Sequence, residues 1–455
     1  MGVPAFAVLV LLLLPEPLAK WLPDFAMPNP RDVVVTGVGA ISPLGIGNDA
    51  LWQNLESGAS GVSVLPEFVD TGLPFRFGGI VQGFEGKDFV QPRKTLKVMS
   101  REIQIGFSSA VLAMRSAGLE KGNIDPERLG VVMGSELLYG ELEELREAFI
   151  AASPNHEFQW PLWADSAMKN LFPLWMLKYL PNMAACHIGI AHDARGPNNS
   201  IVQGDVSSLL AIAESASVIR RGHADVVITG GSGSYVAYAA IAFRGWQHLT
   251  AWTGDGQVVP RVFDKRHDGF VLGEGAGALV LESREHAEKR GAKILAEVAG
   301  TSSRFQKPLP YGDTTSPLPS HGISGSIEGA LKAANLQPSQ IGHVAAGSSG
   351  IALVDRAEAQ GIAKVLGDVP VTAYKSRFGH LGAGSSAVEA VATVLALQKG
   401  IVPVTRNCEE VDPACPINVV KEKQGPLSGR PASALVLSQS QTGQCAAVAL
   451  VGPEA

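Results

Sequence analysis

The residue with the most informative chemistry is Asp205, which lies within a stretch that has the pattern of a nucleophile elbow. Residues 196–211 read Gly-Pro-Asn-Asn-Ser-Ile-Val-Gln-Gly-Asp-Val-Ser-Ser-Leu-Leu-Ala. This order predicts a turn, a short buried strand, a sharp bend at Gly204 and Asp205, and a helix that continues to Gly222. A strand that turns sharply into a helix presents the residue at the bend to the helix N-terminus, where many enzymes hold a nucleophile.

An aspartate at such a bend has two possible roles. Its carboxylate is ionised at neutral pH and is a much weaker nucleophile toward an acyl group than a thiolate. The helix N-terminus favours a negative charge by about 0.3–1 kcal/mol. The first possible role of Asp205 is therefore that of an N-cap or structural anchor, with no part in catalysis. The alternative is a residual catalytic role, and the rest of the chain must decide between the two.

The composition limits the class of protein. The chain has 455 residues, of which 46% are apolar, which is enough for two ordinary domains or one large duplicated domain. With 37 basic and 43 acidic residues the net charge is −6, which argues against a nucleic-acid surface. The four cysteines are scattered without metal or disulfide spacing, which predicts buried thiols in the reducing cytoplasm: Cys186, Cys408, Cys415 and Cys445.

The amino terminus carries an apolar run at residues 3–14, followed by Pro-Glu-Pro. A membrane span needs about 20 apolar residues, so this run is too short for one. It also has neither a basic residue before it nor the cleavage pattern of a signal peptide after it. Residues 1–30 are therefore either a loose membrane-associating extension or upstream sequence read in error before Met27. We favour the second interpretation and expect membrane contact only if residues 1–26 are retained.

The remaining chain alternates strand and helix patterns in two rounds. Such alternation predicts an α/β fold with parallel-dominated sheets covered by helices. Strands are expected at 31–39, 129–135, 224–231, 278–282, 294–300, 343–347 and 371–374, and helices at 49–57, 101–117, 325–334 and 356–366. An insertion at 136–190, rich in Trp and Met, is typical of a cap or a subunit contact. The first strand ends in a glycine pair, but Ser42 stands where a dinucleotide-binding loop needs its third glycine, so no nicotinamide cofactor is expected.

Three motifs resemble the β-ketoacyl synthase (ketosynthase) family of condensing enzymes. They are the elbow at 196–211, the opening Thr-Gly-Val-Gly-Ala-Ile-Ser-Pro-Leu-Gly at 36–45, and residues 261–277, which match a long family motif almost residue for residue. The resemblance covers roughly residues 31–451. It implies a duplicated thiolase fold with five layers, αβαβα, and a helical cap at the insertion. The N-terminal half would span 31–282 and the C-terminal half 283–455.

Family enzymes use a cysteine nucleophile, two histidines and a supporting lysine, and need neither metal nor cofactor. By resemblance, Asp205 stands at the cysteine position. Gly347, in the sequence Gly-Ser-Ser-Gly-Ile-Ala, stands at the first histidine position and offers no imidazole. Lys375 and His380 match the family's lysine and second histidine within Tyr-Lys-Ser-Arg-Phe-Gly-His-Leu-Gly.

Two further acidic positions support this alignment. Asp355 and Glu358 fall where the family carries its acidic residues, shortly after the loop that begins at Gly347. Lys375 and Glu358 are expected to keep the family's buried ion pair, whose breakage costs a few kcal/mol. Lys375 and His380 are therefore expected to be retained for architecture.

The C-terminal segment also departs from the family pattern. Residues 437–445 read Leu-Ser-Gln-Ser-Gln-Thr-Gly-Gln-Cys where the family has a loop rich in glycine and phenylalanine. Gln439 takes the place of the gating aromatic. Three elements of the site have thus changed together, at Asp205, Gly347 and Gln439, while the motif at 261–277 is intact.

Three hypotheses follow from this joint change. The first is a ketosynthase-like subunit without condensing activity, similar to a chain-length factor, which would pair with an active ketosynthase in fatty-acid or polyketide synthesis. The second is an enzyme that still acts on acyl-carrier-protein thioesters, either a malonyl decarboxylase that uses His380 or an acyltransferase that uses Asp205. The third is a homodimer that binds an acyl chain. An acyl carrier protein is an expected partner of the first two.

Overall fold

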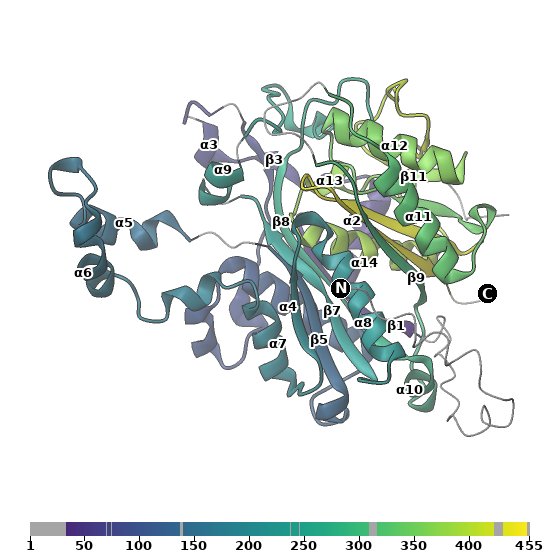
Figure 1. Cartoon of the computed structure of the whole chain (residues 1–455), viewed down its shortest axis with the longest axis horizontal. Coiled ribbons are helices and arrows are strands. Elements are labelled where there is room, and N and C mark those ends of the chain that lie inside the picture. Colours follow the sequence, from purple (N-terminus) through teal and green to yellow (C-terminus); the bar gives the residue numbers. More distant parts are fainter. Residues whose placement is uncertain are drawn as a thin grey trace, which may run out of the picture.

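The structure is a computed structural model, shown in Figure 1, and it describes residues 33–69, 71–73, 75–136, 140–236, 238–244, 246–308, 316–422 and 431–452. The expected apolar extension at 1–30 lies outside these ranges. Within them, no helix combines the length and the apolar character needed to cross a bilayer.

The sheet of the N-terminal half is built from long apolar strands rich in valine and glycine. In space it runs β1 (Val33–Ser42), β8 (Leu272–Ser283), β7 (Val226–Ser234), β5 (Leu129–Ser135) and β6 (Asn198–Val202). All of them except β6 are buried over nearly their whole length, as expected for strands covered on both faces.

The sheet of the C-terminal half repeats this order. It runs β9 (Ala296–Phe305), β14 (Gln444–Val451), β13 (Ser433–Gln439), β10 (His343–Ala345) and β11 (Pro370–Thr372), with β12 (Asn418–Val419) added at the edge. Numbered within each half, and without β12 and the short strands β2 (Gly45–Ile46), β3 (Val62–Val64) and β4 (Phe77–Gly79), both sheets have the order 1-5-4-2-3, so the expected duplication is confirmed. The halves join where β1 pairs with β9 at Val34 and Val35.

The strand directions correct one expectation, since each half-sheet is mixed rather than dominated by parallel pairs. β8 pairs antiparallel with both β1 and β7, while β5 pairs parallel with β7 and β6. β14, β13 and β10 repeat this pattern in the other half. The last strand of each half returns antiparallel between its neighbours, which a pattern of alternating elements cannot show.

Three layers of helices enclose the two sheets and complete the predicted five-layer arrangement (Figure 1). α4 (Arg101–Ala117) and α7 (Met183–His192) cover the outer face of the N-terminal sheet. α11 (His321–Ala334) and α12 (Ala352–Leu366) cover that of the C-terminal sheet. Between the sheets lie α8 (Ser207–Arg220) and α14 (Gly384–Lys399).

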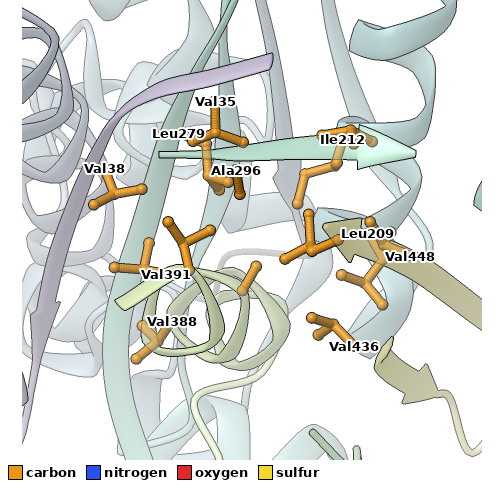
Figure 2. Close-up of a cluster of buried hydrophobic side chains, with 14 of the residues drawn as sticks. Val35, Val38, Leu209, Ile212, Leu279, Ala296, Val388, Val391, Val436 and Val448 are labelled. Atoms are coloured by element: carbon orange, nitrogen blue, oxygen red, sulfur yellow. The ribbon is translucent and has the colours of Figure 1, made fainter. Parts of the chain in front are cut away.

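The central helix layer forms the main core. Figure 2 shows Leu209 of α8 and Val388 of α14 packed between Val35 of β1 and Val436 of β13, so one apolar cluster includes both halves. Each large apolar side chain buried in this way contributes about 1.5–3 kcal/mol. The two halves therefore share a core and position the residues between them as one unit.

The insertion at 136–190 contains two helices that stand away from the body of the molecule (Figure 1). α5 (Leu142–Ala151) and α6 (Trp160–Asn170) pack on each other through Phe149, Phe158 and Trp163. The chain then returns to the body through a 3-10 turn at Trp175–Tyr179 and α7. The other strands and α-helices of the described residues are β2 (Gly45–Ile46), α2 (Asn48–Ser57), β3 (Val62–Val64), α3 (Pro66–Val69), β4 (Phe77–Gly79), α9 (Tyr238–Arg244), α10 (Arg284–Lys289) and α13 (Lys375–Phe378).

Candidate active site

The carboxyl ends of parallel strands bring the candidate residues together. Asp205 follows β6, and in the other half Gly347 follows β10 and Lys375 follows β11. Residues after neighbouring parallel strands meet at one edge of a sheet, which is where α/β proteins place their sites. The two duplicated halves turn these edges toward each other, and His380 and Gln439 complete the group.

The predicted elbow is present, although its strand is not buried. β6 leads into a 3-10 turn at Gly204–Val206 and then directly into α8. Gly204 has a φ of 60°, a left-handed conformation that glycine adopts without strain. β6 is an edge strand with exposed or half-buried residues, because no strand pairs with its outer side within the described residues. The expectation of a buried strand was therefore wrong.

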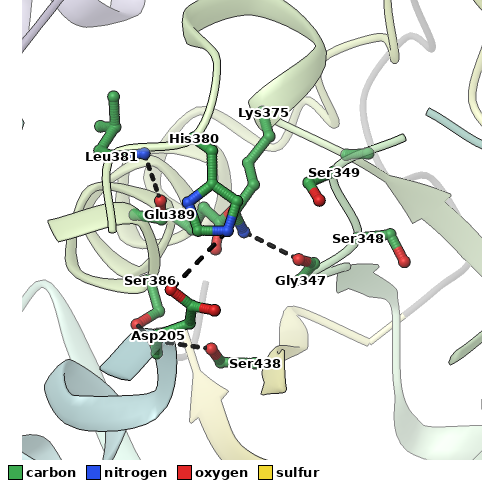
Figure 3. Close-up of polar contacts among 12 residues, drawn as sticks. Asp205, Gly347, Ser348, Ser349, Lys375, His380, Leu381, Ser386, Glu389 and Ser438 are labelled. Carbon is green, nitrogen blue, oxygen red and sulfur yellow. Dashed lines mark hydrogen bonds and ion pairs between the residues drawn. The ribbon is translucent and has the colours of Figure 1, made fainter. Parts of the chain in front are cut away.

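Asp205 does not cap the helix, which corrects the N-cap interpretation. Val206 is the N-cap of α8 and no side chain caps it. The Asp205 carboxylate instead accepts a hydrogen bond from the Tyr235 hydroxyl at 2.8 Å and lies 3.7 Å from Nε2 of His380. Its backbone oxygen accepts hydrogen bonds from Ser438 at 2.9 Å and Ser386 at 3.2 Å (Figure 3). The carboxylate is thus anchored by side chains from both halves.

The orientation of His380 follows from its backbone contact. Its Nδ1 accepts a hydrogen bond from the Gly382 N–H at 3.1 Å, so a neutral ring carries its proton on Nε2. This N–H faces the Asp205 carboxylate (Figure 3). The imidazole is 5% exposed and stacks on Tyr235, with a centroid distance of 5.0 Å. His380 therefore keeps a proton donor at the site.

Gly347 lies in a position that leaves no room for a side chain. A Cβ atom there would lie 2.8 Å from the backbone oxygen of Leu437 and 2.9 Å from Cα of Ser438, both on β13. Its own N–H donates to Glu358 at 2.9 Å, and its oxygen accepts from Lys375 at 2.9 Å. β13 thus packs closely against the loop that begins at Gly347.

Gly347→Ala is expected to lower the free energy of unfolding by about 1–3 kcal/mol, because the added methyl group overlaps backbone atoms that cannot rotate away. The matched control is Gly325→Ala on α11, where the nearest atom to a new Cβ is 3.4 Å away in the flexible Arg304 side chain. That variant should be neutral or slightly more stable. Urea unfolding of the two variants measures the difference, and equal stability would contradict the packing argument.

Lys375 corrects the expected ion pair. Its ammonium, 2% exposed, lies 2.7 Å from a carboxylate oxygen of Glu389 on α14 and donates to the Gly347 oxygen (Figure 3). Glu358 instead accepts from the Gly347 N–H and is hydrogen-bonded to the Ser348 hydroxyl. Lys375 begins α13 and Glu389 lies on α14, and the loop that carries His380 separates the two helices. No local sequence pattern therefore indicates that Glu389 pairs with Lys375.

Two carboxyl groups therefore share one buried lysine. Burial raises the pKa of Glu358 to about 7, and it also raises the pKa of Glu389 despite the attraction of Lys375. A carboxyl group with a pKa of about 7 is partly protonated near neutrality, and Glu358 accepts hydrogen bonds from the Ser348 hydroxyl and the Gly347 N–H. Glu389 is the carboxyl group that pairs directly with Lys375, through an oxygen 2.7 Å from the ammonium.

The raised pKa of Glu358 predicts a pH dependence of stability. The unfolded chain releases this proton near pH 4.5 and the folded chain near pH 7, so the free energy of unfolding falls as the pH rises through this window. Protonation of Glu358 contributes on the order of 3 kcal/mol to the free energy of unfolding. This contribution is fully present below about pH 4.5 and is lost above about pH 7. Glu358→Gln, which keeps both hydrogen bonds, should lose this dependence and exceed the wild type in stability at pH 8. Urea unfolding at pH 5 and pH 8 tests it, with exposed Glu328→Gln on α11 as control. A Glu358→Gln curve parallel to that of the wild type would contradict the assignment.

Asp355 fixes the loop that begins at Gly347. Its fully buried carboxylate accepts hydrogen bonds from the N–H groups of Phe263, at 2.9 Å, and Gly350, at 3.1 Å, and contacts Nδ1 of His267 at 3.2 Å. It therefore ties the Gly347 loop to the intact motif at 261–277. The Asp355 carboxylate therefore acts by holding these two segments together.

Gln439 ends β13, and the segment expected to be a gating loop is a β-hairpin. Ser440 and Gly443 close a tight turn before β14, with Ser440 N–H donating to the Gln444 oxygen at 2.8 Å. The Gln439 side chain is 8% exposed and donates to the Val354 oxygen at 3.2 Å. The glutamine is thus held against α12.

The residues predicted for the site line one small cavity. Asp205, Gly347, His380 and Gln439 are among its walls, and Gln306, Lys307 and Gln441 are also part of its lining. Lys375, Glu358 and Asp355 lie behind the walls. None of the described residues that line it is a cysteine, and the described chain holds no cluster of His, Cys, Asp or Glu that would bind a metal ion. Burial raises the pKa of the nearby Cys445 thiol to about 12, so it is no substitute nucleophile.

Sequence reasoning missed Tyr235, Ser438 and Glu389. Tyr235 could have been found from topology, since it directly follows β7, and β5, β6 and β7 are parallel. Glu136, Asp205 and Tyr235 each lie at or just beyond the carboxyl end of one of these strands. All three side chains are buried near the same edge.

Comparison with known proteins agrees with this geometry. The sequence matches the family model of the beta-ketoacyl synthase N-terminal domain over residues 30–287 and that of the C-terminal domain over residues 296–409. The 3-oxoacyl-[acyl-carrier-protein] synthase 2 of Vibrio cholerae is 32% identical over 397 residues, covering 86% of this chain and 92% of that protein. The same-named protein of Staphylococcus aureus strain N315 is 28% identical over 405 residues, covering 87% and 92%.

Solved structures show the same fold. A type II polyketide synthase acyl-carrier protein in complex with its ketosynthase includes a chain that is 28% identical, with a TM-score of 0.80 and coverage of 93% of this chain and 100% of that one. The ishigamide ketosynthase/chain length factor gives 27% identity, a TM-score of 0.80 and the same coverage. With the shared two-half sheet order, the elbow and the matched family models, the chain belongs to the β-ketoacyl synthase family.

Proposed function

We propose that this chain is a ketosynthase-fold subunit without condensing activity of its own, which pairs with an active ketosynthase in fatty-acid or polyketide synthesis. The observation that carries the proposal is the combination of Asp205 at the nucleophile position with Gly347 packed directly against β13. Loss of members of a catalytic unit can cost about 10⁶ in rate, or roughly 8 kcal/mol of activation free energy.

The surrounding contacts support retention of the scaffold rather than of the chemistry. The Asp205 carboxylate is engaged by the Tyr235 hydroxyl, which further weakens it as a nucleophile. Lys375 and Asp355 meanwhile each keep at least two buried partners. A family member that keeps this framework but exchanges its reactive groups is similar to a chain-length factor.

The exposed apolar side chains support assembly with another chain. Apart from Val64, Val69 and Phe305, every exposed large apolar side chain among the described residues falls between Leu142 and Trp246. Exposed large apolar side chains are thus enriched in this part of the chain, and such side chains favour contact with a partner. The same stretch contains β6, whose outer edge is unpaired within the described chain. An open edge fits the equivalent strand of a second chain with the same fold. We assign the outer edge of β6 and the exposed apolar side chains of this stretch to contact with the active ketosynthase.

Purification from the native cell, followed by mass spectrometry of co-eluting chains, tests the proposal. The expected result is a second ketosynthase with an intact cysteine nucleophile at one-to-one stoichiometry. The isolated chain should show no condensation of acyl and malonyl groups on carrier proteins. Ordinary ketosynthase rates from the isolated chain would overturn the proposal. Recovery of a homodimer without a second ketosynthase would contradict the proposed pairing and show that the chain associates with itself.

His380 favours one second candidate, a malonyl decarboxylase. Its Nε2–H faces the cavity and can stabilise an enolate that forms when carbon dioxide leaves a malonyl thioester. Gly347 removes the second donor such a reaction would use. Carbon dioxide release from malonyl-carrier protein that disappears in His380→Ala would support this function over the non-catalytic subunit.

A further inference from the structure

Tyr235 occupies the space directly beside the two reactive-site residues Asp205 and His380. It follows the last residue of β7 and is 4% exposed. Its hydroxyl donates to Asp205 at 2.8 Å, and its ring stacks on His380 at 5.0 Å with an angle of 17° between the planes. The ring also lies 6.1 Å from that of Phe270. Hydrogen bonding and stacking thus fix both ends of the side chain.

The backbone on the other side of the ring prevents it from moving away. A Cβ atom placed on Gly382 would lie 2.8 Å from Cε1 of Tyr235 and 1.8 Å from the Glu136 carboxylate. Glu136 is 2% exposed and accepts a hydrogen bond from the Ala383 N–H at 3.2 Å. Tyr235 and Glu136 therefore fill the space against the loop that follows His380.

A second cavity lies beyond the segment that carries Tyr235. Ser234 and Val236, the neighbours of Tyr235 in sequence, line a cavity of about 220 Å³ together with Arg101 and Glu274. On the other side, Asp205 and His380 line the site cavity. Tyr235 itself lines neither cavity, but it lies between two residues that line one of them and contacts two residues that line the other.

The site cavity itself is too small for an acyl chain. The space that the centre of a water molecule can occupy within it is about 20 Å³. A single water needs about 10–15 Å³ by this measure, so the cavity holds one water or two. An acyl thioester that entered from the side of Lys307 would meet the Tyr235 ring at Asp205.

We infer that Tyr235 closes the route of an acyl chain past Asp205, so that this chain excludes acyl groups from its own interior. The inference rests on the proposed function for its ligand class, an acyl thioester. The ring performs the closure, and the hydroxyl only holds it in place.

The test uses neutral N-acetylcysteamine thioesters of butyric, hexanoic, octanoic and decanoic acid, titrated into the full chain. If a chain enters an apolar interior, affinity rises by about fourfold for each added CH₂ group. The wild type and Tyr235→Phe, which keeps the ring, should show no rise with length. Tyr235→Ala should show the rise, provided that circular dichroism and cooperative unfolding show that it is folded.

The outcomes separate this inference from the proposed function. A length-dependent affinity in the wild type would overturn the closure by Tyr235 even if Tyr235→Ala failed to fold, and so would a flat series in a folded Tyr235→Ala. Tyr235→Leu supplies a second, less disruptive opening. Condensation by the wild type would instead overturn the proposed function, while binding without condensation would leave that function in place.

Discussion

Asp205→Cys is expected to leave condensation undetectable, at least about 10³-fold below an ordinary ketosynthase. The new thiol would lie at the N-terminus of α8, where its thiolate is stabilised. The site would still lack the donor that the family's first histidine supplies, because Gly347 has no side chain. Tyr235 would also still fill the space beside the thiol.

The measurement is mass spectrometry of 3-oxoacyl-carrier protein formed from acyl- and malonyl-carrier proteins. Asp205→Asn is the matched blank, since it removes the charge without adding a thiol. The intact mass of the Asp205→Cys chain shows separately whether the thiol becomes acylated. Rapid turnover by the single variant would show that His380 suffices, and the account of the site would then be wrong.

The double variant Asp205→Cys/Gly347→His should fail as well, for a different reason. The Cβ of a residue at 347 would lie within 2.9 Å of β13 backbone atoms at Leu437 and Ser438, so the imidazole cannot be added without moving the strand. Restoring both chemical groups therefore costs stability instead of restoring activity.

Lys375→Met is expected to lower the free energy of unfolding by about 3–5 kcal/mol, the largest stability effect anticipated for this chain. The substitution keeps the length of the side chain but removes the cation that lies 2.7 Å from Glu389. Glu389 is completely buried, so its charge would lose its partner in a medium that solvates it poorly. The Gly347 oxygen would lose its hydrogen bond at the same time.

Urea unfolding measures this loss, with Lys332→Met as the control, since Lys332 is exposed on α11. The control should lie within about 0.5 kcal/mol of the wild type. Lys375→Met/Glu389→Leu should recover part of the loss, because replacing both partners of a buried pair by apolar groups is far less costly than removing one. A loss below about 1 kcal/mol in the single variant would show that Lys375 is retained for a reason other than architecture.

These two expectations explain why one part of the site has persisted while another has changed. Lys375 and Asp355 each hold the Gly347 loop from behind the cavity wall, so their replacement would destabilise the fold. The side chains of Asp205 and Gln439 face the cavity, and the close approach of β13 at Gly347 is compatible with a stable fold. Stability therefore constrains the residues behind the cavity walls more strongly than those that face it.

The amino-acid sequence by itself determined the succession of strands and helices, the duplication and the identity of the altered positions. Runs of valine closed by glycine predict buried strands, and the Gly-Asp bend before an apolar helix predicts the elbow, because both depend on local backbone and side-chain preferences. The motif at 261–277 gave the family without knowledge of any contact. Asp205 and Gly347 were identified by their place relative to such motifs.

The tertiary structure alone decided what those residues contact. Glu389 rather than Glu358 pairs with Lys375, Tyr235 rather than the helix end binds Asp205, and β13 occupies the space a side chain at Gly347 would need. The tertiary structure also decided that β8 and β14 run antiparallel to their neighbours. Each of these contacts joins segments far apart in the chain or in different halves, and their geometry is set by how the two sheets pack around α8 and α14. Local sequence patterns carry no information on contacts between such distant segments.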